Sequence, residues 1–176
     1  MRLLIASTAV LSLALLAFVR PVFQEASPEA RAKELLAPYA GTWDTTMSMA
    51  GMESKGQEVV TALPHGLAVT VHSTSDMGPM GKYEGHGIMG FEPKTGRWHH
   101  VWADSMTPGM SVTTGRWSDD GKDFIVESEE DMGMGPMKVV MTMHKDDADH
   151  MTWTMRAKDA SDGAAPIMSM KYTRRK

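Results

Sequence analysis

Hydrophobic and polar residues alternate along most of the chain that follows residue 40. In the segment Gly41–Met49, for example, Trp43, Met47 and Met49 share one face, and Asp44 lies on the other. Successive side chains of a β-strand point to opposite faces, so this pattern predicts strands with one face on a core and one face in water. The predicted strands are Gly41–Met49, Gln57–Leu63, Ala68–Thr74, Tyr83–Phe91, Arg97–Asp104, Ser111–Ser118, Asp123–Glu129, Met137–His144, Met151–Lys158 and Met168–Arg174.

Short runs rich in Pro, Gly and Asp separate these strands, such as Pro93–Gly96 and Asp119–Gly121, and they favour tight turns. One helix precedes the strands: Ser27 is a good N-cap, Pro28 suits the first helical position, and Pro38 ends the helix. Consecutive short hairpins predict an all-β fold, an up-and-down antiparallel barrel of about ten strands entered from one short N-terminal helix. A two-sheet sandwich fits the same pattern and is the alternative.

The first residues form an apolar run, Leu3–Val19, between Arg2 and Arg20. Such a run behind a positive charge is typical of a secretory signal peptide, whereas a membrane-spanning helix normally needs about 20 apolar residues. We therefore expect residues 1–26 to be a signal peptide, residues 27–176 to be a single β-barrel domain, and the mature protein to be exported, periplasmic or secreted. In the alternative interpretation the segment is not cleaved and anchors the protein in a membrane. The chain has no Cys, so export supplies neither a disulfide nor a lipid anchor on cysteine.

The charge of the chain argues against one class of partner. The formal net charge is −4, and it becomes −5 when Arg2, Arg20 and Glu25 leave with the signal peptide. A protein that binds nucleic acid normally presents a basic face, so no nucleic acid is expected as a partner. A membrane is a partner only if the signal peptide is uncleaved, and the sequence does not predict the oligomeric state.

The two ends of the strand region carry recognisable residues. Gly41-Thr42-Trp43 opens the first predicted strand directly after the helix, and the chain ends on Tyr172-Thr173-Arg174-Arg175-Lys176. A Gly-x-Trp opening combined with a basic closing strand resembles the calycin superfamily, which includes lipocalins and fatty-acid-binding proteins. The resemblance implies that Arg174 or Arg175 lies across Trp43 in a structural cation–π contact near the closed end of the barrel.

A closer resemblance lies in the middle of the chain. Residues 84–91 read Glu-Gly-His-Gly-Ile-Met-Gly-Phe, and residues 98–106 read Trp-His-His-Val-Trp-Ala-Asp-Ser-Met. Together with the closing Tyr-Thr-Arg, they resemble the DUF1579 family, exported bacterial proteins without an assigned function, over about residues 35–175. The family tends to have Tyr-Asp where this chain has Phe91-Glu92. The resemblance implies a calycin-like barrel and implies no chemistry.

One predicted strand places two indoles, an imidazole and a carboxylate on the same face. Polar groups inside an aromatic cavity must be paired or hydrated, so His100 and Asp104 are candidates for holding the polar head of a ligand. Two alternatives stay open: the two residues form the acid–base pair of an enzyme, or they are structural, with Asp104 capping turn amides. The expected ligand-binding residues are Trp98, His100, Trp102, Asp104, Met47, Met141 and Trp153.

No motif in the chain demands a cofactor. The segment Gly85–Gly90 precedes no helix and lacks a Lys-Ser/Thr end, so it is not a phosphate loop; its glycines are expected to permit bending or close backbone approach. The seven His lack the spacing of a zinc site, and only the likeness to haem-binding calycin barrels keeps a haem ligand among them as an alternative. No serine nucleophile motif occurs. We expect no cofactor, and a binding protein rather than an enzyme.

The peptide Met-Gly-Pro-Met occurs twice, at Met77–Met80 and Met134–Met137, in a chain with 18 Met. Thioethers fill irregular apolar space and also ligate soft metals such as Cu(I) and Ag(I). Because both copies fall at predicted turns, they suit a soft apolar rim at a barrel mouth. The favoured function is therefore the binding of a small apolar or amphipathic molecule inside a barrel lined by Met and Trp. The alternative is a soft-metal site formed by Met77, Met80, Met134 and Met137, with His72 or His144 as helpers.

Overall fold

The computed structural model describes residues 26–131, 135–161 and 163–176. Within these ranges no helix is both long enough and apolar enough to cross a membrane. The elements are α1 (Pro28–Leu36), the 3-10 turn η1 (Ala37–Tyr39), β1 (Gly41–Met49), β2 (Met52–Ala62), β3 (Ala68–Asp76), the 3-10 turn η2 (Gly78–Met80), β4 (Lys82–Glu92), β5 (Arg97–Asp104), β6 (Ser111–Trp117), β7 (Asp123–Asp131), β8 (Pro136–Lys145), β9 (His150–Ala157) and β10 (Met168–Arg174).

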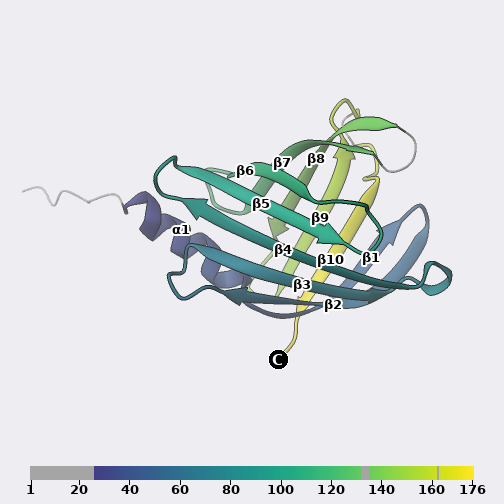
Figure 1. Cartoon of the computed structure of the whole chain (residues 1–176), viewed down its shortest axis with the longest axis horizontal. Coiled ribbons are helices and arrows are strands. Elements are labelled where there is room, and N and C mark those ends of the chain that lie inside the picture. Colours follow the sequence, from purple (N-terminus) through teal and green to yellow (C-terminus); the bar gives the residue numbers. More distant parts are fainter. Residues whose placement is uncertain (1–25, 132–134, 162) are drawn as a thin grey trace, which may run out of the picture.

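The ten strands form one closed barrel, and each strand is antiparallel to both of its neighbours (Figure 1). Strands β2 to β10 follow one another around the barrel in chain order, and β1 closes the sheet by pairing with both β2 and β10. The predicted up-and-down barrel is confirmed. The two-sheet sandwich is excluded because the sheet closes on itself and leaves no edge.

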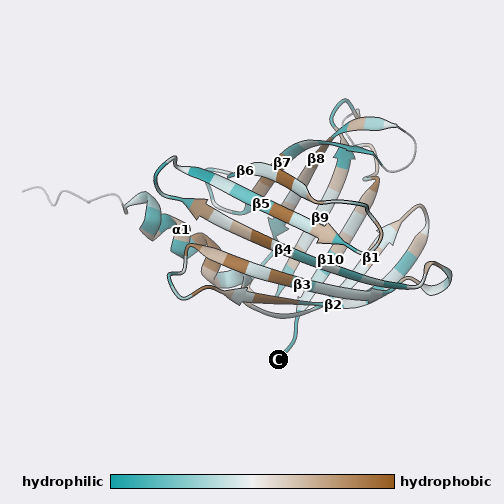
Figure 2. Ribbon diagram, viewed as in Figure 1, coloured by the Kyte–Doolittle hydropathy of each residue, from teal (hydrophilic) through white to brown (hydrophobic). Residues whose placement is uncertain are grey.

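Alternation along the strands separates an inner from an outer face. Figure 2 shows hydrophobic and hydrophilic residues following one another along β3, β4 and β5. In β3, for instance, Val69 and Ser73 are buried inside, whereas His72 and Thr74 are exposed outside. The inner face is therefore not purely apolar, and a buried polar side chain is more informative about function than a buried apolar one.

Helix α1 closes one end of the barrel (Figure 1). Ser27 caps it, because the Ser27 hydroxyl oxygen accepts a hydrogen bond from the Ala30 amide at 3.2 Å. Ala32 and Leu36 are each 1% exposed and belong to the same buried cluster as Trp43. A helix of nine residues is too short to be stable alone, so this packing holds it in place.

The last strand fastens the same end. The guanidinium carbon of Arg174 lies 4.0 Å from the centre of the Trp43 ring. Its Nη1 donates to the Ala40 carbonyl at 2.9 Å, and its Nη2 donates to the Pro38 carbonyl. Of the two arginines that the sequence offered for this position, Arg174 occupies it, whereas Arg175 forms an ion pair on the outer face.

Most strands begin and end within two residues of the predicted bounds, but β2 begins at Met52 rather than at Gln57. The chain passes from β1 to β2 through a two-residue turn in which Ala50 has φ 50° and Gly51 has φ 77°. Two positive φ values define the type I′ hairpin turn. Alanine rarely adopts a positive φ, so the residues Ala50-Gly51 do not predict this turn as Asn-Gly would. The predicted start of the second strand at Gln57 was therefore wrong.

Candidate functional site in the barrel interior

The interior of the barrel has two different halves. Beside α1 the inward side chains are buried in one continuous cluster, which includes Trp43, Trp98 and Tyr172. Toward the opposite end, inward residues such as Met47 and Trp102 keep intermediate exposure. Water therefore reaches these inward side chains at the end away from α1.

The seven residues expected to bind a ligand divide between these halves. Trp98 belongs to the packed half: its ring centre lies 5.2 Å from that of Phe91 and 5.7 Å from that of Trp117. It supports the wall and offers little surface to a ligand, since it is 8% exposed. The other six residues point inward and are partly exposed: Met47 on β1, His100, Trp102 and Asp104 on β5, Met141 on β8, and Trp153 on β9. Of these, Met141 and Trp153 also pack against the buried cluster.

Trp102 lies flat against the inner wall. It is paired with Gly87 on β4, and a Cβ atom added to Gly87 would stand 2.6 Å from the indole Cε3. A Cβ on Gly85 would collide with the same indole at Cζ2. The glycines of β4 thus allow the close approach of a large ring to the backbone.

Asp104 is fully engaged by its own hairpin. Its Oδ2 accepts a hydrogen bond from Trp102 Nε1 at 3.1 Å, and its Oδ1 accepts bonds from the amides of Met106 and Thr107 at 2.8 and 2.7 Å. These contacts order the turn after β5 and hold the Trp102 ring. The carboxylate therefore acts as a turn cap and as a support for the lining.

His100 and Asp104 do not form an acid–base pair. They lie four residues apart on one strand, roughly 13 Å along the chain, with Trp102 between them. Among the described residues no hydrogen bond joins the two side chains. The His100 ring is nearly parallel to the Trp102 indole, with ring centres 6.1 Å apart, and burial lowers the pKa of His100 below its usual value. His100 is thus a neutral, aromatic part of the wall near pH 7.

Glu58 is the residue that the sequence analysis missed. It lies on β2, is 6% exposed, and faces Ser73 on β3. Burial raises the pKa of Glu58 to about 7, and a hydrogen bond with the Ser73 hydroxyl acts in the opposite direction. The signal was present in the sequence, since the alternation that puts Ser54, Gly56 and Val60 inside also puts Glu58 inside.

Two tyrosines surround this carboxyl group with further polar atoms. Burial raises the pKa of Tyr172 and, with the charge of Asp104, that of Tyr83; the charge of Glu58 acts in the same direction on both. Both phenols therefore stay protonated and retain a hydrogen-bond donor inside the barrel. The polar groups at this place in the interior are therefore two phenol donors, Tyr83 and Tyr172, and one acid, Glu58.

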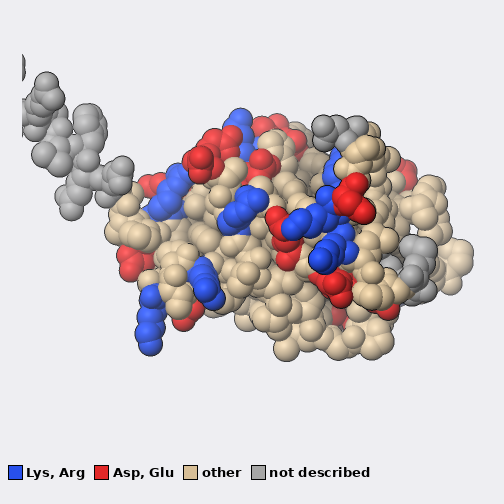
Figure 3. Space-filling view, turned by 90° about the horizontal axis from the view of Figure 1, so that it is seen from above, with Lys and Arg blue, Asp and Glu red and all other residues tan. Residues whose placement is uncertain are grey.

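The open half of the interior is acidic, whereas the outer surface is mixed. By alternation Asp104 and Glu130 face inward there, and Glu58 faces inward where the two halves meet, because it is paired with Trp43 on β1. The described strands place no Lys or Arg among the inward residues of the open half. The Ser128 hydroxyl donates to Glu130 at 2.6 Å and helps to hold it. On the outer face seen in Figure 3, acidic and basic residues lie side by side. The barrel therefore offers a local negative potential inside rather than a charged face outside.

The two Met-Gly-Pro-Met peptides do not form one site. Met77–Met80 makes the hairpin turn between β3 and β4, where η2 lies, while the second copy joins β7 to β8. Met134 lies outside the described residues, and Met137 is already part of β8. Around the barrel, β5 and β6 lie between the β3–β4 pair and the β7–β8 pair. Among the described members of the predicted quartet, Met77 and Met80 thus lie on one hairpin and Met137 on another.

A different methionine cluster occupies the rim. Met47, Met49, Met52, Met77 and Met80 line one pocket of ≈ 20 Å³ together with Glu53 and Ser54. That volume is about the space of a single water molecule. The hydroxyl of Ser54 is buried and has no hydrogen-bond partner among the described residues. The first Met-Gly-Pro-Met copy thus meets methionines of β1 and β2 at the rim.

The histidines lie mostly outside the barrel. His65 sits in a turn, where its Nδ1 accepts from the Leu67 amide at 3.1 Å, and His144 pairs with Asp123 on the outer surface. Among the described residues, His100 is the one histidine whose position in the alternation faces the interior. Any haem bound inside the barrel would depend on this single imidazole.

Comparisons with known proteins give one family and several barrels of low identity. Residues 28–174 match the family described as "Protein of unknown function (DUF1579)". No curated protein matches the sequence. Among solved structures, a redesigned β barrel is 19% identical with a TM-score of 0.42, covering 83% of this chain and 96% of that chain. The redesigned barrel mFAP0, bound to DFHBI, is 17% identical with a TM-score of 0.40, covering 80% and 99%. A de novo designed fluorescence-activating β barrel is 11% identical with a TM-score of 0.45, covering 80% and 96%.

Proposed function

This chain belongs to the DUF1579 family of proteins of unknown function, and we propose that it binds a small amphipathic molecule with a basic polar end in the open half of its barrel. The observation that carries the proposal is Glu58, a carboxyl group buried among aromatic residues beneath a partly exposed lining of Met and Trp. A mainly apolar site with a few convergent polar groups is the usual constitution of a small-molecule pocket.

The lining supplies the apolar part of the recognition. Met47, Met141 and Trp153 come from strands on one side of the barrel, and Trp102 faces them from β5. Methionine side chains adapt to irregular ligand shapes, and indoles bury large apolar area at low entropic cost. An alkyl or aryl group of moderate size fits this lining better than a polar molecule does.

The charge of the interior favours a basic polar end. Glu58 and Glu130 offer carboxylates, and His100 is neutral near pH 7. A protonated amine that enters would form charge-assisted hydrogen bonds with Glu58, whereas a carboxylate ligand would meet like charges. Because the pKa of Glu58 is about 7, the binding of an amine should strengthen as the pH rises from about 6 to about 8.

We further propose that the protein is exported. Residues 1–26 have the composition of a signal peptide, and residues 1–25 lie outside the described part of the chain. Cleavage after Ala26 would leave Ser27 at the new N-terminus, directly at the cap of α1. N-terminal sequencing of the protein from its native host tests this. A retained residue 1–26 segment would instead support the membrane-anchored alternative.

The ligand proposal is tested by titration with dodecylamine and, as a matched probe of opposite charge, dodecanoate. Intrinsic tryptophan fluorescence should respond to the amine, because Trp102 and Trp153 line the site. Glu58→Gln should weaken amine binding by about 10- to 100-fold, as expected for the loss of one charged hydrogen-bond partner. The control Glu129→Gln lies on the outer face of β7 and should leave the affinity unchanged. Tighter binding of dodecanoate than of dodecylamine would contradict the proposal, as would equal affinities for Glu58→Gln and the wild type.

A second candidate function is the binding of Cu(I) or Ag(I) at the rim. The observation that favours it is the pocket in which five methionines meet beside the Ser54 hydroxyl, which has no partner among the described residues. Clustered thioethers are soft ligands that select these ions over harder cations. This set shares Met77 and Met80 with the quartet expected from the sequence. It has Met47, Met49 and Met52 in place of Met134 and Met137.

Titration with Ag(I) separates this candidate from the quartet. Met77→Leu/Met80→Leu should lose the affinity, while Met137→Leu, on β8, should keep it. Leucine preserves apolar volume, so the variants should remain folded. An unchanged affinity of the double variant, or no affinity in the wild type, would eliminate the candidate.

A further inference from the structure

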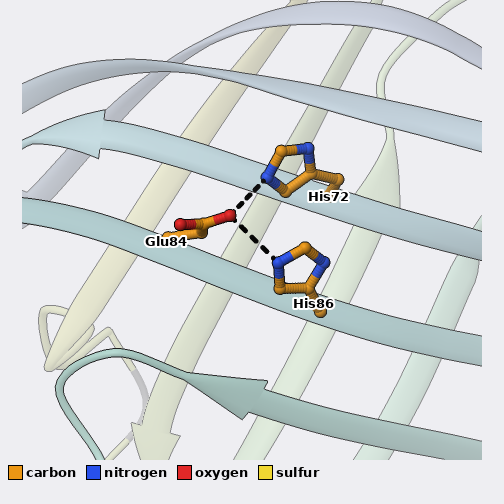
Figure 4. A group of neighbouring side chains, drawn as sticks. All are labelled: His72, Glu84 and His86. Carbon is orange, nitrogen blue, oxygen red and sulfur yellow. Dashed lines mark hydrogen bonds and ion pairs between the residues drawn. The ribbon is translucent and has the colours of Figure 1, made fainter.

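A chemically distinct cluster lies on the outside of the barrel, on β3 and β4. His72, Glu84 and His86 point toward one another there, as Figure 4 shows. Glu84 Oε1 is 3.1 Å from the Nε2 of His72 and 3.1 Å from the Nε2 of His86. All three donor atoms lie within 4.8 Å of one another, the one such group of His and acidic residues among the described residues.

The register of one hairpin builds this cluster. His72 and His86 are directly opposite each other across β3 and β4, and their rings stack with centres 4.5 Å apart and planes 7° from parallel. Glu84 precedes His86 by two residues and therefore shares its outer face. The position of Glu84 is fixed further, because its amide donates to the Ser105 hydroxyl at 3.1 Å and its carbonyl accepts from the Ser105 amide at 2.8 Å.

We propose that His72, Glu84 and His86 bind a divalent transition-metal ion such as Zn²⁺. Imidazole nitrogen and carboxylate oxygen are ligands of this class of ion, at bond lengths of about 2.0–2.2 Å. Two ligand atoms at that distance, held at tetrahedral or octahedral angles, stand roughly 3.0–3.4 Å apart. Both nitrogen–oxygen distances, at 3.1 Å, already fall in this range.

The remaining adjustment is small. The two imidazole nitrogens must approach each other, and both side chains can pivot because they are 47% and 63% exposed. The Glu84 carboxylate oxygen already faces both Nε2 atoms, and an ion bound between them would replace these two contacts.

The cluster also leaves coordination positions open. Three protein ligands from two strands occupy only one side of the ion, and all three side chains are exposed. An open groove of ≈ 590 Å³ adjoins Glu84 and is lined by Thr74, Asp76 and Lys82 among others. Water or a small anion can therefore complete the coordination from the solvent side. This arrangement has the form of sites that bind exchangeable ligands rather than that of closed structural sites.

Other histidine–carboxylate pairs of the barrel provide matched comparisons. His150 and Asp147 lie 2.9 Å apart in the turn before β9, with His150 53% exposed, and they include one imidazole only. A single imidazole and one carboxylate give too few fixed ligands for tight binding. His150 lies on β9, on the other side of the barrel from β3 and β4.

The test is calorimetric titration with Zn²⁺ of the protein purified without a histidine tag. The wild type should bind one ion per chain. His72→Gln/His86→Gln should abolish this event. Glu84→Gln should weaken it by more than about tenfold, since even outer-shell changes at metal sites cost about 10–100-fold. His150→Gln should bind as the wild type does.

Circular dichroism melts establish that each variant is folded. We expect this result because the substituted side chains are exposed. Unchanged Zn²⁺ affinity in the His72/His86 variant, or no binding by the wild type, would overturn the proposal. A loss of affinity in His150→Gln equal to that in the double variant would do the same. Binding of dodecylamine and of Ag(I) should be unaffected by these substitutions, so the outcome is independent of the functions proposed above.

Discussion

The two ends of this barrel are built from the same alternating pattern and yet differ in what fills them. Beside α1 the interior is packed with aromatic and aliphatic side chains, and Arg174 covers Trp43 from the closing strand. At the other end the inward residues are methionines, hydroxyls and acids that stay partly exposed. The period-two pattern therefore fixes which side chains point inward, while side-chain size and polarity decide whether the interior is filled.

This division separates stability from binding within one sheet. Apolar burial at the closed end supplies the free energy of folding. The open end contributes less, and the buried acid Glu58, which is paired with Trp43 where the two halves meet, is itself unfavourable for stability. The comparison predicts that substitutions at the two ends have different consequences.

The largest expected effect is on stability at the closed end. Trp43→Ala should lower the free energy of unfolding by about 3–5 kcal/mol, because the indole is 1% exposed and leaves a large cavity. Trp102→Ala, at the open end, should cost about 1–2 kcal/mol, since solvent already reaches that ring. Urea denaturation measures both. Equal losses would break the distinction between the two ends.

The next effect concerns pH. Burial raises the folded-state pKa of Glu58 from 4.5 to about 7, so between these values the folded protein holds a proton that the unfolded chain has released. Stability from this group is present below pH 4.5 and is lost as the pH rises through about 7. Glu58→Gln should therefore match the wild type near pH 4.5 and exceed it by up to about 3 kcal/mol at about pH 8.

Chemical denaturation at several pH values checks this prediction. The exposed acids Asp76 and Glu84 have lowered pKa values, so their titration falls below the same window and does not mask it. A constant difference between Glu58→Gln and the wild type from about pH 4.5 to about pH 8 would show that Glu58 ionises normally.

Arg174→Met tests the closure of the packed end. It removes the cation–π contact with Trp43 and leaves the carbonyls of Pro38 and Ala40 without their donor, at a cost of about 2 kcal/mol. The matched control is Arg175→Met, which breaks an exposed outer ion pair and should cost less than about 1 kcal/mol. Thermal melts of the two variants measure both losses of stability. Equal losses would show that Arg174 has no special structural role.

The smallest effect is expected at the wall of the open end. A Cβ on Gly85 would collide with the Trp102 indole, which would have to shift toward the barrel interior. Gly85→Ala should cost about 1 kcal/mol, at the low end of overpacking changes, and should alter the tryptophan emission. An unchanged spectrum would mean that the ring does not rest on the backbone of β4.

The barrel itself could be predicted because its information is local. Alternation within each strand, the cap at Ser27 and the turn residues all act over a few positions, and they agree with one another. The one displaced boundary, at the start of β2, follows from a turn that uses Ala50 at a positive φ. The residue types at that turn do not distinguish it from a continuing strand.

The candidate sites were harder to predict from the sequence, because they depend on which residues pair between neighbouring strands. His72 and His86 meet only because the turn of their hairpin sets the register, and a shift of one residue would send one of them inside. Glu58 occupies an inward position of β2 but was overlooked, because an acidic residue in a strand is normally assigned to the solvent-facing side. The two Met-Gly-Pro-Met peptides belong to separate hairpins, and a repeat within the sequence does not indicate whether its copies lie together in space.

The most direct test of the central claim is a ¹³C NMR titration of the Glu58 carboxyl group in the free protein and in the protein saturated with dodecylamine. We expect a pKa near 7 in the free protein, and a pKa at least about one unit lower in the complex, because a bound amine favours the carboxylate by about tenfold or more. A pKa near 4.5 in the free protein, or the same pKa with and without the amine, would contradict it.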